Sequence, residues 1–373
     1  MKKIYYITAV FATLFLVGCG DGIDLPGVNV ETDLNKIPLP DNNVNLEQVE
    51  LKPSTEPMLH EGLHTEEDFQ RIRDKKAAGE EPWVSAYQLL VESQFSQKTA
   101  DTYPTEWIKR GISGDENYMN AARGATIVYQ QALRWKIEQD DEYAAKAVEN
   151  LNKWVQTCVG VTGNTNLSLA AGLYGYEFAI AGELLRDYGG WDRADFAAFQ
   201  NWLLKVFYPA NDDFLKRHHD TNALHYWANW CLCNIAAKMA IGIVTDRRDI
   251  YNEGSDHLQT GYTNGRLRRA IYHDYAPDYN FAQWQESGRD QGHTLMCVGL
   301  MGIICQLAWS QGDDFFAYDD NLFMRACEYA ACCNYTNETV PYTTYIWQKQ
   351  SQWGYPIPEE QTTLGGGKWI KHA

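Results

Sequence analysis

The sequence has few patterns typical of β-strands and a deficit of basic residues. Strand-like alternation of apolar and polar residues is nearly absent, which excludes an architecture built mainly on sheets. The 373 residues include 32 Lys and Arg against 49 Asp and Glu, so the net charge is −17. This balance argues against a nucleic-acid partner. An acidic polymer would also be repelled at long range and could bind only at a locally basic site.

A disulfide framework is also missing. Apart from Cys19, the cysteines lie in or at the end of apolar, helix-like runs such as MCVGLMGIICQLAW. They are Cys158, Cys231, Cys233, Cys297, Cys305, Cys327, Cys332 and Cys333. We expect them to act as small buried hydrophobic residues. Cys-x-Cys and Cys-Cys pairs without a histidine at ligand spacing are weak evidence for zinc, so we expect neither a metal nor a cofactor.

The N-terminus reads MKKIYYITAVFATLFLVGCGDG and carries a mainly apolar run. The run from Ile4 to Val17 is too short to span a bilayer, and it follows two lysines, as in a secretory signal. Leu16 to Cys19 resembles a bacterial lipobox. We therefore predict a lipoprotein signal peptide over residues 1–19, with Cys19 lipidated and the protein anchored in the bacterial outer membrane, facing the periplasm or the cell surface. The alternative is an ordinary signal peptide with a chance cysteine.

Residues 20–56 are rich in Pro, Asn, Asp and Val, and show no sustained helical period, which is typical of a flexible tether. The remaining residues, 57–373, are enough for one large domain with a sizeable core. The chain ends with GGGKWIKHA, which resembles a glycine-rich loop, and we expect a further C-terminal segment to follow it.

The body of the chain is a succession of helical patterns broken by Gly, Pro, Asn and Asp. Thr65 and the three acids after it predict a helix start, and helical spacing continues over residues 116–139, 142–159, 167–190 and 194–208. Only VPYTTYIWQ, near the end, is predicted to be extended. No fixed repeat length is present, which disfavours a solenoid. The 13 Trp and 23 Tyr favour an incomplete (α/α) toroid of antiparallel helix pairs, because a groove lined by rings suits sugars.

Three blocks in this body resemble a known family. They are ALRWKIEQDDEYAAKAVENLNKW, HYWANWCLCNIAAKMAIGIVTDRRDIY and WQESGRDQGHTLMCVGLMG. They resemble the α/α-toroid alginate lyases, and most of all the alginate and glucuronan lyases of polysaccharide lyase family thirty-eight. The resemblance implies cleavage of a uronic-acid polymer by β-elimination. It also implies Asn, His, Arg or Gln to neutralise the uronate carboxylate, and Tyr, with or without His, as the base at C5 and the acid at O4.

The first candidate cluster is HHDTNALHYWANW, residues 218–230. We predict that it opens a helix, on which Asn222 and His225 share one face and act in catalysis. We predict substrate contacts from His218, His219, Tyr226, Trp227 and Trp230. The plainer alternative is a set of structural histidines. A metal site on His218, His219, Asp220 and His225 matches no known ligand spacing.

The second candidate cluster covers residues 265–293 and is the most basic and tyrosine-rich stretch of the chain. Arg269 and Tyr275 are the predicted catalytic residues, because their separation is close to that of the arginine and tyrosine in related lyases. Positive neighbours such as Arg266 and Arg268 are expected to lower the pKa of a tyrosine and make it a better base. Tyr279 is the alternative to Tyr275. The predicted substrate contacts are Tyr279, Gln285, Arg289, Gln291 and His293. A solvated Arg-rich helix is the plainer alternative.

One position departs from the family pattern. Related lyases carry an Asn-His pair where this chain has Asn222 and Ala223. Alanine can neither transfer a proton nor neutralise a carboxylate. Either His225 takes over the role, or the chain is a weakened or silenced form in which Ala223 replaces the histidine.

Two rival functions remain open. A surface lipoprotein that binds glycans without cutting them would also use tryptophans and a lipid anchor. A hydrolase would need two carboxylates on opposite sides of the sugar, whereas Glu286 and Asp290 are predicted to lie one turn apart on the same helix. The expected partner is an acidic polysaccharide, either alginate or another uronan, and the sequence leaves a homodimer open.

Overall fold

The computed structural model describes residues 56–336, 338–350 and 356–366. The predicted signal peptide, Cys19, the tether up to residue 55 and most of the final GGGKWIKHA lie outside these residues. The chain is divided into two compact units. Of the described residues, unit 1 contains 56–211 and Ala237–Tyr251, and unit 2 contains Asp212–Ala236 and those from Asn252 onward.

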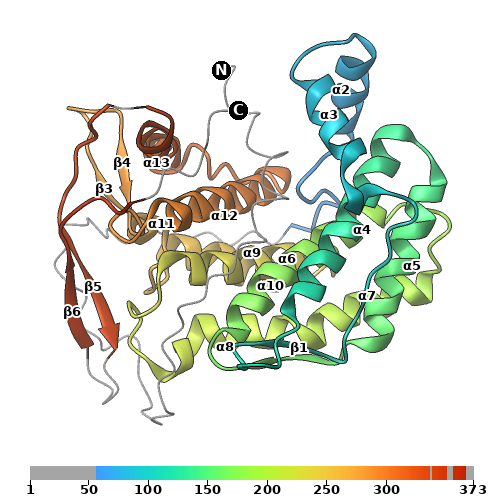
Figure 1. Ribbon diagram of the computed structural model, residues 1–373, viewed down its shortest axis with the longest axis horizontal. Coiled ribbons are helices and arrows are strands. Elements are labelled where there is room, and N and C mark those ends of the chain that lie inside the picture. Colours follow the sequence, from blue (N-terminus) through green and yellow to red (C-terminus); the bar gives the residue numbers. More distant parts are fainter. Residues whose placement is uncertain (1–55, 337, 351–355, 367–373) are drawn as a thin grey trace. The chain divides into compact units, whose positions relative to one another are not determined.

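Unit 1 is helical, and its helices begin and end close to the predicted positions (Figure 1). Thr65 and Asp68 cap the first helix reciprocally, as the sequence predicts. Two short strands, β1 (Trp107–Arg110) and β2 (Gly160–Gly163), pair in parallel. The helices are α2 (Glu66–Ala77), α3 (Trp83–Glu92), α4 (Tyr118–Glu138), α5 (Asp141–Thr157), α6 (Leu167–Leu185) and α7 (Arg193–Val206), with a 3-10 turn at Gln94–Ser96.

The core of unit 1 forms where α4 packs against α5 and α6. Helix α6 is buried along almost its whole length, because its residues are mostly small or apolar. The Phe178 ring lies 5.4 Å from that of Trp154 and 5.2 Å from that of Trp202. These three rings therefore fill the interior of the unit rather than line a surface.

Three helices contain residues of both units, because a boundary between the units falls inside each of them. They are α8 (Tyr208–Arg217), α9 (Ala228–Val244) and α10 (Arg248–Thr260).

Unit 2 combines helices with two antiparallel strand pairs. Strand β4 packs on α13, and α12 packs along α13. By length and composition α12 could also cross a membrane, but it is mostly buried here, as a core helix is. The elements are a 3-10 turn η4 (His218–Asp220), α11 (Leu267–Ala270), β3 (Ile271–Asp274), β4 (Ala282–Trp284), α12 (Gln291–Ser310), α13 (Tyr318–Tyr335), β5 (Tyr345–Gln350) and β6 (Pro356–Gln361).

The β5–β6 hairpin confirms the predicted extended segment. The two strands are antiparallel, with Tyr345 opposite Gln361 and Trp347 opposite Glu359. Tyr345 is buried, whereas its neighbour Ile346 exposes 37% of its surface. Because side chains alternate along a strand, β5 has one face turned toward the rest of unit 2.

The cysteines behave as the sequence predicts. All eight described cysteines are free thiols, and six of them are buried. They therefore fill space in the cores rather than link segments.

Candidate functional site

Residues 221–227 form a loop between η4 and α9, not the start of a helix. The prediction that Asn222 and His225 share a helical face is therefore wrong. The side chain of Asn222 instead accepts a hydrogen bond from the backbone N–H of Leu224 (3.0 Å), a turn that competes with helix formation. The amide of Asn264 donates to the carbonyl oxygens of Leu224 (3.1 Å) and Tyr226 (2.8 Å). The loop is thus held by side chains from the next segment of unit 2.

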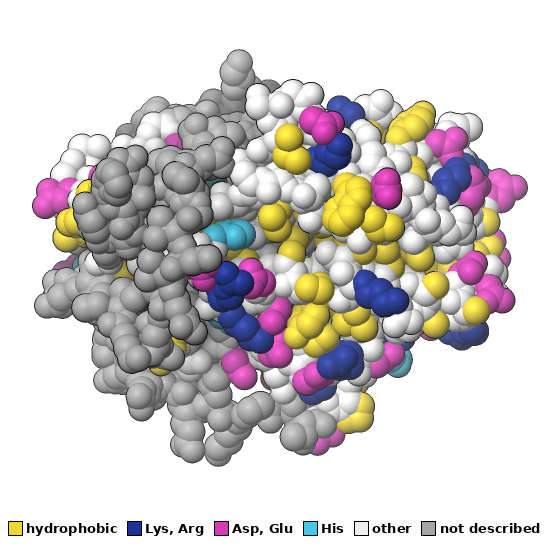
Figure 2. All heavy atoms as spheres, turned by 90° about the horizontal axis from the view of Figure 1, so that it is seen from below, with side chains coloured by type: hydrophobic (Ala, Val, Ile, Leu, Met, Phe, Trp, Pro, Cys, Tyr) yellow, Lys and Arg dark blue, Asp and Glu magenta, His cyan; other side chains and the backbone are white. Residues whose placement is uncertain are grey.

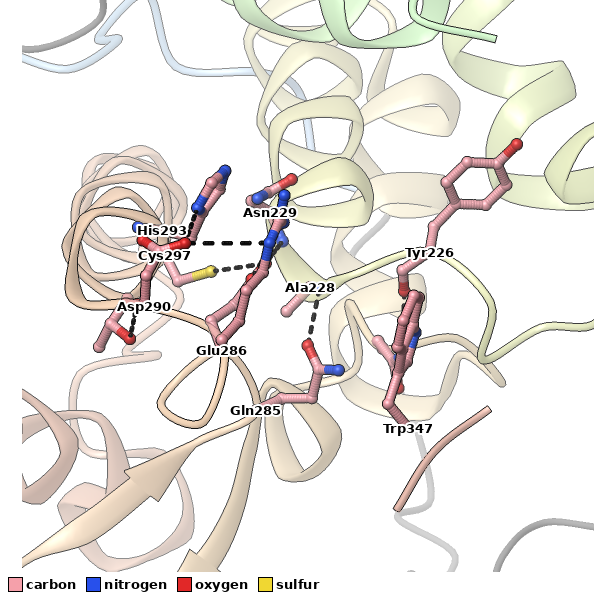
Figure 3. Close-up of polar contacts among 12 residues, drawn as sticks. Tyr226, Ala228, Asn229, Gln285, Glu286, Asp290, His293, Cys297 and Trp347 are labelled. Atoms are coloured by element: carbon pink, nitrogen blue, oxygen red, sulfur yellow. Dashed lines mark hydrogen bonds and ion pairs between the residues drawn. The ribbon is translucent and has the colours of Figure 1, made fainter. Parts of the chain in front are cut away.

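The N-terminus of α9 is capped by the two residues that follow β4. The Gln285 side chain accepts a hydrogen bond from the backbone N–H of Ala228 (3.0 Å), and Glu286 accepts one from that of Asn229 (3.2 Å) (Figure 3). A carboxylate at this position also interacts favourably with the helix dipole. Gln285 is buried, so the structure gives this predicted substrate contact a structural role.

His218 is fully buried, in contrast to its predicted contact with substrate. Its ring lies 4.6 Å from that of Phe214, and its Nε2 atom lies 3.3 Å from the sulfur of Cys231. Burial lowers the pKa of His218 well below the ordinary value. His218 is therefore a structural histidine. His219 is half-buried, and its ring lies 5.8 Å from that of Tyr226.

These two histidines belong to η4, a left-handed turn that follows α8. The φ angles of His218, His219 and Asp220 are 49°, 52° and 60°. Residues with side chains rarely adopt this conformation, which costs roughly 1–2 kcal/mol each. The turn ends α8 and directs the chain into the loop at Asn222.

His225 lies beneath strand β5. Its ring stacks on that of Trp347 at 6.2 Å and 14°, and its carbonyl oxygen accepts a hydrogen bond from the indole N–H of Trp347 (2.7 Å). Burial, together with the positive charge of Lys349, lowers the pKa of His225 to about 4. The imidazole is therefore neutral at neutral pH and able to accept a proton.

The predicted sugar platforms of the first cluster are mostly buried. Trp227 stacks on Trp347 with ring centroids 4.4 Å apart, and Tyr226 packs 4.6 Å from Trp230. Tyr226, Trp227 and Trp230 expose 9% or less of their surface. Other residues of unit 2 cover the faces of these rings. The rings therefore pack behind the loop and do not offer a free surface to a sugar.

The basic character of the second cluster is largely neutralised. Arg268 forms an ion pair with Asp319, and Arg289 forms one with Glu286 (3.4 Å). On the face shown in Figure 2, Lys and Arg side chains similarly lie beside Asp and Glu side chains. A run of arginines in the sequence therefore does not give a broad positive field.

Arg269 is the exception in this cluster. It is 7% exposed, and neither its Nε nor its Nη2 atom has a hydrogen-bond partner. Burial, with a contribution from Arg266, lowers the pKa of Arg269 to about 10, so the guanidinium remains charged at neutral pH. An unpaired buried charge costs several kcal/mol. This cost is understandable if the position serves to bind an anion.

Tyr275 is half-buried at the end of β3. Its hydroxyl donates to the side-chain oxygen of Gln283 (2.5 Å) and lies 3.1 Å from the hydroxyl of Thr343. Burial raises the pKa of Tyr275, in contrast to the expected lowering by arginines. The phenol therefore stays protonated and is a better proton donor than base. Tyr279, the alternative, is 53% exposed.

The residues just before α12 also differ from the prediction. Asp290 caps the helix by accepting from the backbone N–H of His293 (2.8 Å), so Arg289 and Glu286 precede the helix. The second oxygen of Asp290 lies 2.5 Å from Nδ1 of His293 and fixes that ring. The guanidinium of Arg289 lies 5.3 Å from the Trp227 ring. Arg289 therefore packs against an aromatic residue of the loop, and His293 is held by Asp290.

Gln291, another predicted substrate contact, is buried and serves the core. Its side-chain oxygen accepts from Asn334 (3.0 Å), and its amide donates to the carbonyl of Gly365 (3.5 Å). The helical pattern of the sequence could not show these partners, because they follow by more than 40 residues.

Ala223 is fully buried in the loop. The methyl group therefore occupies a packed position rather than a vacant space in a cleft. Ala223 has no imidazole, whereas His225, two residues later, carries one that is neutral at neutral pH.

Four residues near the site were not singled out in the sequence. Trp347 and Lys349 come from β5, Asn264 holds the loop, and Asn229 is buried with no partner for either atom of its amide. No sequence signal joins β5 to the loop, because more than 110 residues separate them. Among the described residues, no group of three or more His, Cys, Asp or Glu could hold a metal ion.

Comparisons with known proteins agree with this architecture. Among solved structures, an alginate lyase from Bacteroides ovatus aligns with a TM-score of 0.51 and 13% identity, over 72% of this chain and 82% of that one. Alginate lyase A1-III from Sphingomonas species A1 aligns with a TM-score of 0.51 and 14% identity, over 74% and 80%. A histidine-to-alanine variant of A1-III, complexed with a tetrasaccharide, aligns with a TM-score of 0.54 and 15% identity, over 76% and 82%. No curated protein matches the chain.

These structural likenesses confirm the predicted fold class, since these alginate lyases are α/α toroids. The family model described as alginate lyase matches residues 73–338, which is well over half of the chain. The chain is therefore a polysaccharide lyase and belongs to the alginate lyase family.

Proposed function

We propose that this lyase cuts alginate or a related uronan by β-elimination, with Arg269 neutralising the carboxylate of the sugar that loses its C5 proton. The single observation that carries the proposal is the buried guanidinium of Arg269 without a counter-charge among the described residues. A bidentate carboxylate would satisfy both unpaired nitrogens at once. Pairing also makes the C5 proton more acidic, because the charge that develops on the carboxylate is stabilised.

The proton states of two residues suggest their roles. His225 is neutral at neutral pH and would accept the C5 proton, whereas Tyr275 is protonated and would donate to the leaving O4 oxygen. Both lie along one segment of the chain: Tyr275 contacts Thr343, and His225 stacks on Trp347. Asn222, in the same loop as His225, would hydrogen-bond the carboxylate beside Arg269.

The relatives support a His/Tyr pair. A1-III was complexed with tetrasaccharide both as a histidine-to-alanine and as a tyrosine-to-phenylalanine variant. Hydrolysis is disfavoured in this chain because its candidate acids already have partners. Glu286 caps α9 and is buried, and Asp290 holds His293.

The mass of the product tests the reaction type. Elimination leaves an unsaturated sugar and adds no water, whereas hydrolysis adds one water for each bond cut. We expect mass spectra of digested alginate or glucuronan to show an unsaturated sugar at every newly made non-reducing end, so that only the fragment with the polymer's original non-reducing end is saturated. Saturated products from internal segments, with one added water for each bond cut, would overturn the proposal.

We further propose that the enzyme belongs to polysaccharide lyase family thirty-eight and is a lipoprotein anchored through Cys19. The three sequence blocks and the lipobox support this. Cells fed with a labelled fatty acid should incorporate it into the wild type but not into a Cys19→Ala variant. Equal labelling of both would contradict the anchor.

A further inference from the structure

Strand β5 presents three side chains on the face that is turned toward the rest of unit 2. Tyr345, Trp347 and Lys349 are spaced two apart, so they project from the same side of the strand. Tyr345 is buried, and its hydroxyl donates to the carbonyl oxygen of Gln285. The next residue on this face, Trp347, covers Trp227 and His225.

The loop and the strand are joined by hydrogen bonds as well as by stacking. The amide of Asn222 donates to the carbonyl oxygen of Gln348 (3.2 Å), and the indole of Trp347 donates to the carbonyl oxygen of His225 (2.7 Å). These bonds fix where the residues of β5 lie relative to the candidate acid-base residues. The side chain after Trp347 on this face is therefore placed next to the site.

That side chain is Lys349, and its ammonium has no acidic partner among the described residues. Its Nζ atom lies 5.9 Å from the Trp347 ring, and its cross-strand neighbour is Ile357. The side chain is half-buried rather than extended into solvent. Its charge acts on His225, since it contributes to the lowered pKa of that ring.

We propose that Lys349 is a substrate-binding residue, supplied by β5, that pairs with a uronate carboxylate of the polymer. The proposal rests on the proposed function, because a uronan provides the anion. A uronan carries one carboxylate on every sugar, so an enzyme that neutralises one of them with Arg269 gains affinity from a second cation beside the loop. Trp347 is the positioning residue that holds Lys349 in place.

Steady-state kinetics on alginate and on glucuronan test this role. Lys349→Gln should raise KM by about tenfold with little change in kcat, because the lost contact is present in both the ground state and the transition state. Lys349→Arg should restore most of the affinity. Lys216→Gln, which removes an exposed lysine of the same unit, should leave both constants unchanged. Added salt should raise the KM of the wild type more than that of Lys349→Gln.

An unchanged KM in Lys349→Gln would overturn the proposal, and so would an equal rise in Lys216→Gln. If the wild type yields no unsaturated product from either polymer, the proposed function fails, and Lys349 is tested by calorimetric titration with the same two polymers. Weaker binding by Lys349→Gln would then still support the carboxylate contact. Equal binding by the variant and the wild type would overturn it.

Discussion

Trp347 stacks on Trp227 with ring centroids 4.4 Å apart and ring planes 23° apart. The contact joins a strand near the end of the described chain to the loop that precedes α9. The loop carries Asn222 and His225, so the position of the proposed base depends on a residue more than 110 positions away. Stacked pairs of this kind contribute roughly 0.5–1.5 kcal/mol beyond the area that they bury.

Arg269→Met is expected to abolish most activity without destabilising the protein. Loss of a group that stabilises developing charge costs about 10²–10³-fold in kcat. The unfolding midpoint should stay the same or rise, because an unpaired buried charge is removed. Activity assays and thermal unfolding check both parts.

Arg268→Met serves as the contrast. It breaks the ion pair with Asp319 and should lower stability while leaving turnover largely intact. A lower midpoint for Arg269→Met than for Arg268→Met would contradict the view that Arg269 is kept for binding.

Tyr275→Phe should lower kcat by about 10²–10⁴-fold, the usual contribution of a general acid. Tyr279→Phe should have little effect, because the ring of Tyr279 is exposed and Tyr275 has the organised hydroxyl contacts. Initial rates with saturating polymer distinguish the two. Full turnover by Tyr275→Phe would remove it from the mechanism.

Ala223→His is expected to lower stability and not to raise activity. Ala223 has no exposed surface, and forcing a larger side chain into a packed position costs about 1–3 kcal/mol. Denaturant unfolding and turnover measure the two effects. A clear rise in turnover would instead support a chain silenced by loss of the histidine.

The pH dependence of kcat/KM should reflect a neutral His225. Its pKa is lowered to about 4, so the base form persists as the pH falls, and activity should be lost only near that value. The groups that act on the ring are Lys349 and His219. A rate profile between about pH 4 and 8 checks this. A midpoint at the ordinary histidine value of 6.5 would argue against His225 as the base.

Glu177→Gln should stabilise the protein at alkaline pH. Burial raises the pKa of Glu177 to about 8, and its Oε2 atom has no partner. Between the ordinary value of 4.5 and about 8, the unfolded chain releases this proton while the folded chain keeps it, so stability falls as the pH rises.

The Glu177→Gln variant removes this fall in the free energy of unfolding, which amounts to about 1.4 kcal/mol per pH unit at most. Unfolding at about pH 5 should differ little between the variant and the wild type, whereas at about pH 8 the variant should be more stable. The exposed Glu106→Gln provides the control. A stability difference that does not change with pH would contradict the account.

The sequence predicts the helices of this chain well, because apolar spacing and caps such as Thr65 act locally. It also places Arg269 and Tyr275 in one cluster. It fails where pairing is distant: nothing near Arg268 shows that Asp319 neutralises it, and nothing near His225 shows that Trp347 covers it. The sequence predicts a helix at Asn222, where the structure has a turn, because the apolar residues after it continue into α9.

The most direct test of the central claim is the ultraviolet absorbance of unsaturated uronate, followed with alginate, glucuronan and a glycosaminoglycan in separate tubes. Our account predicts that absorbance rises for the wild type with alginate or glucuronan, and that Arg269→Met shows almost no rise at the same concentration. No rise with any polymer, or an equal rise with the variant, would contradict it.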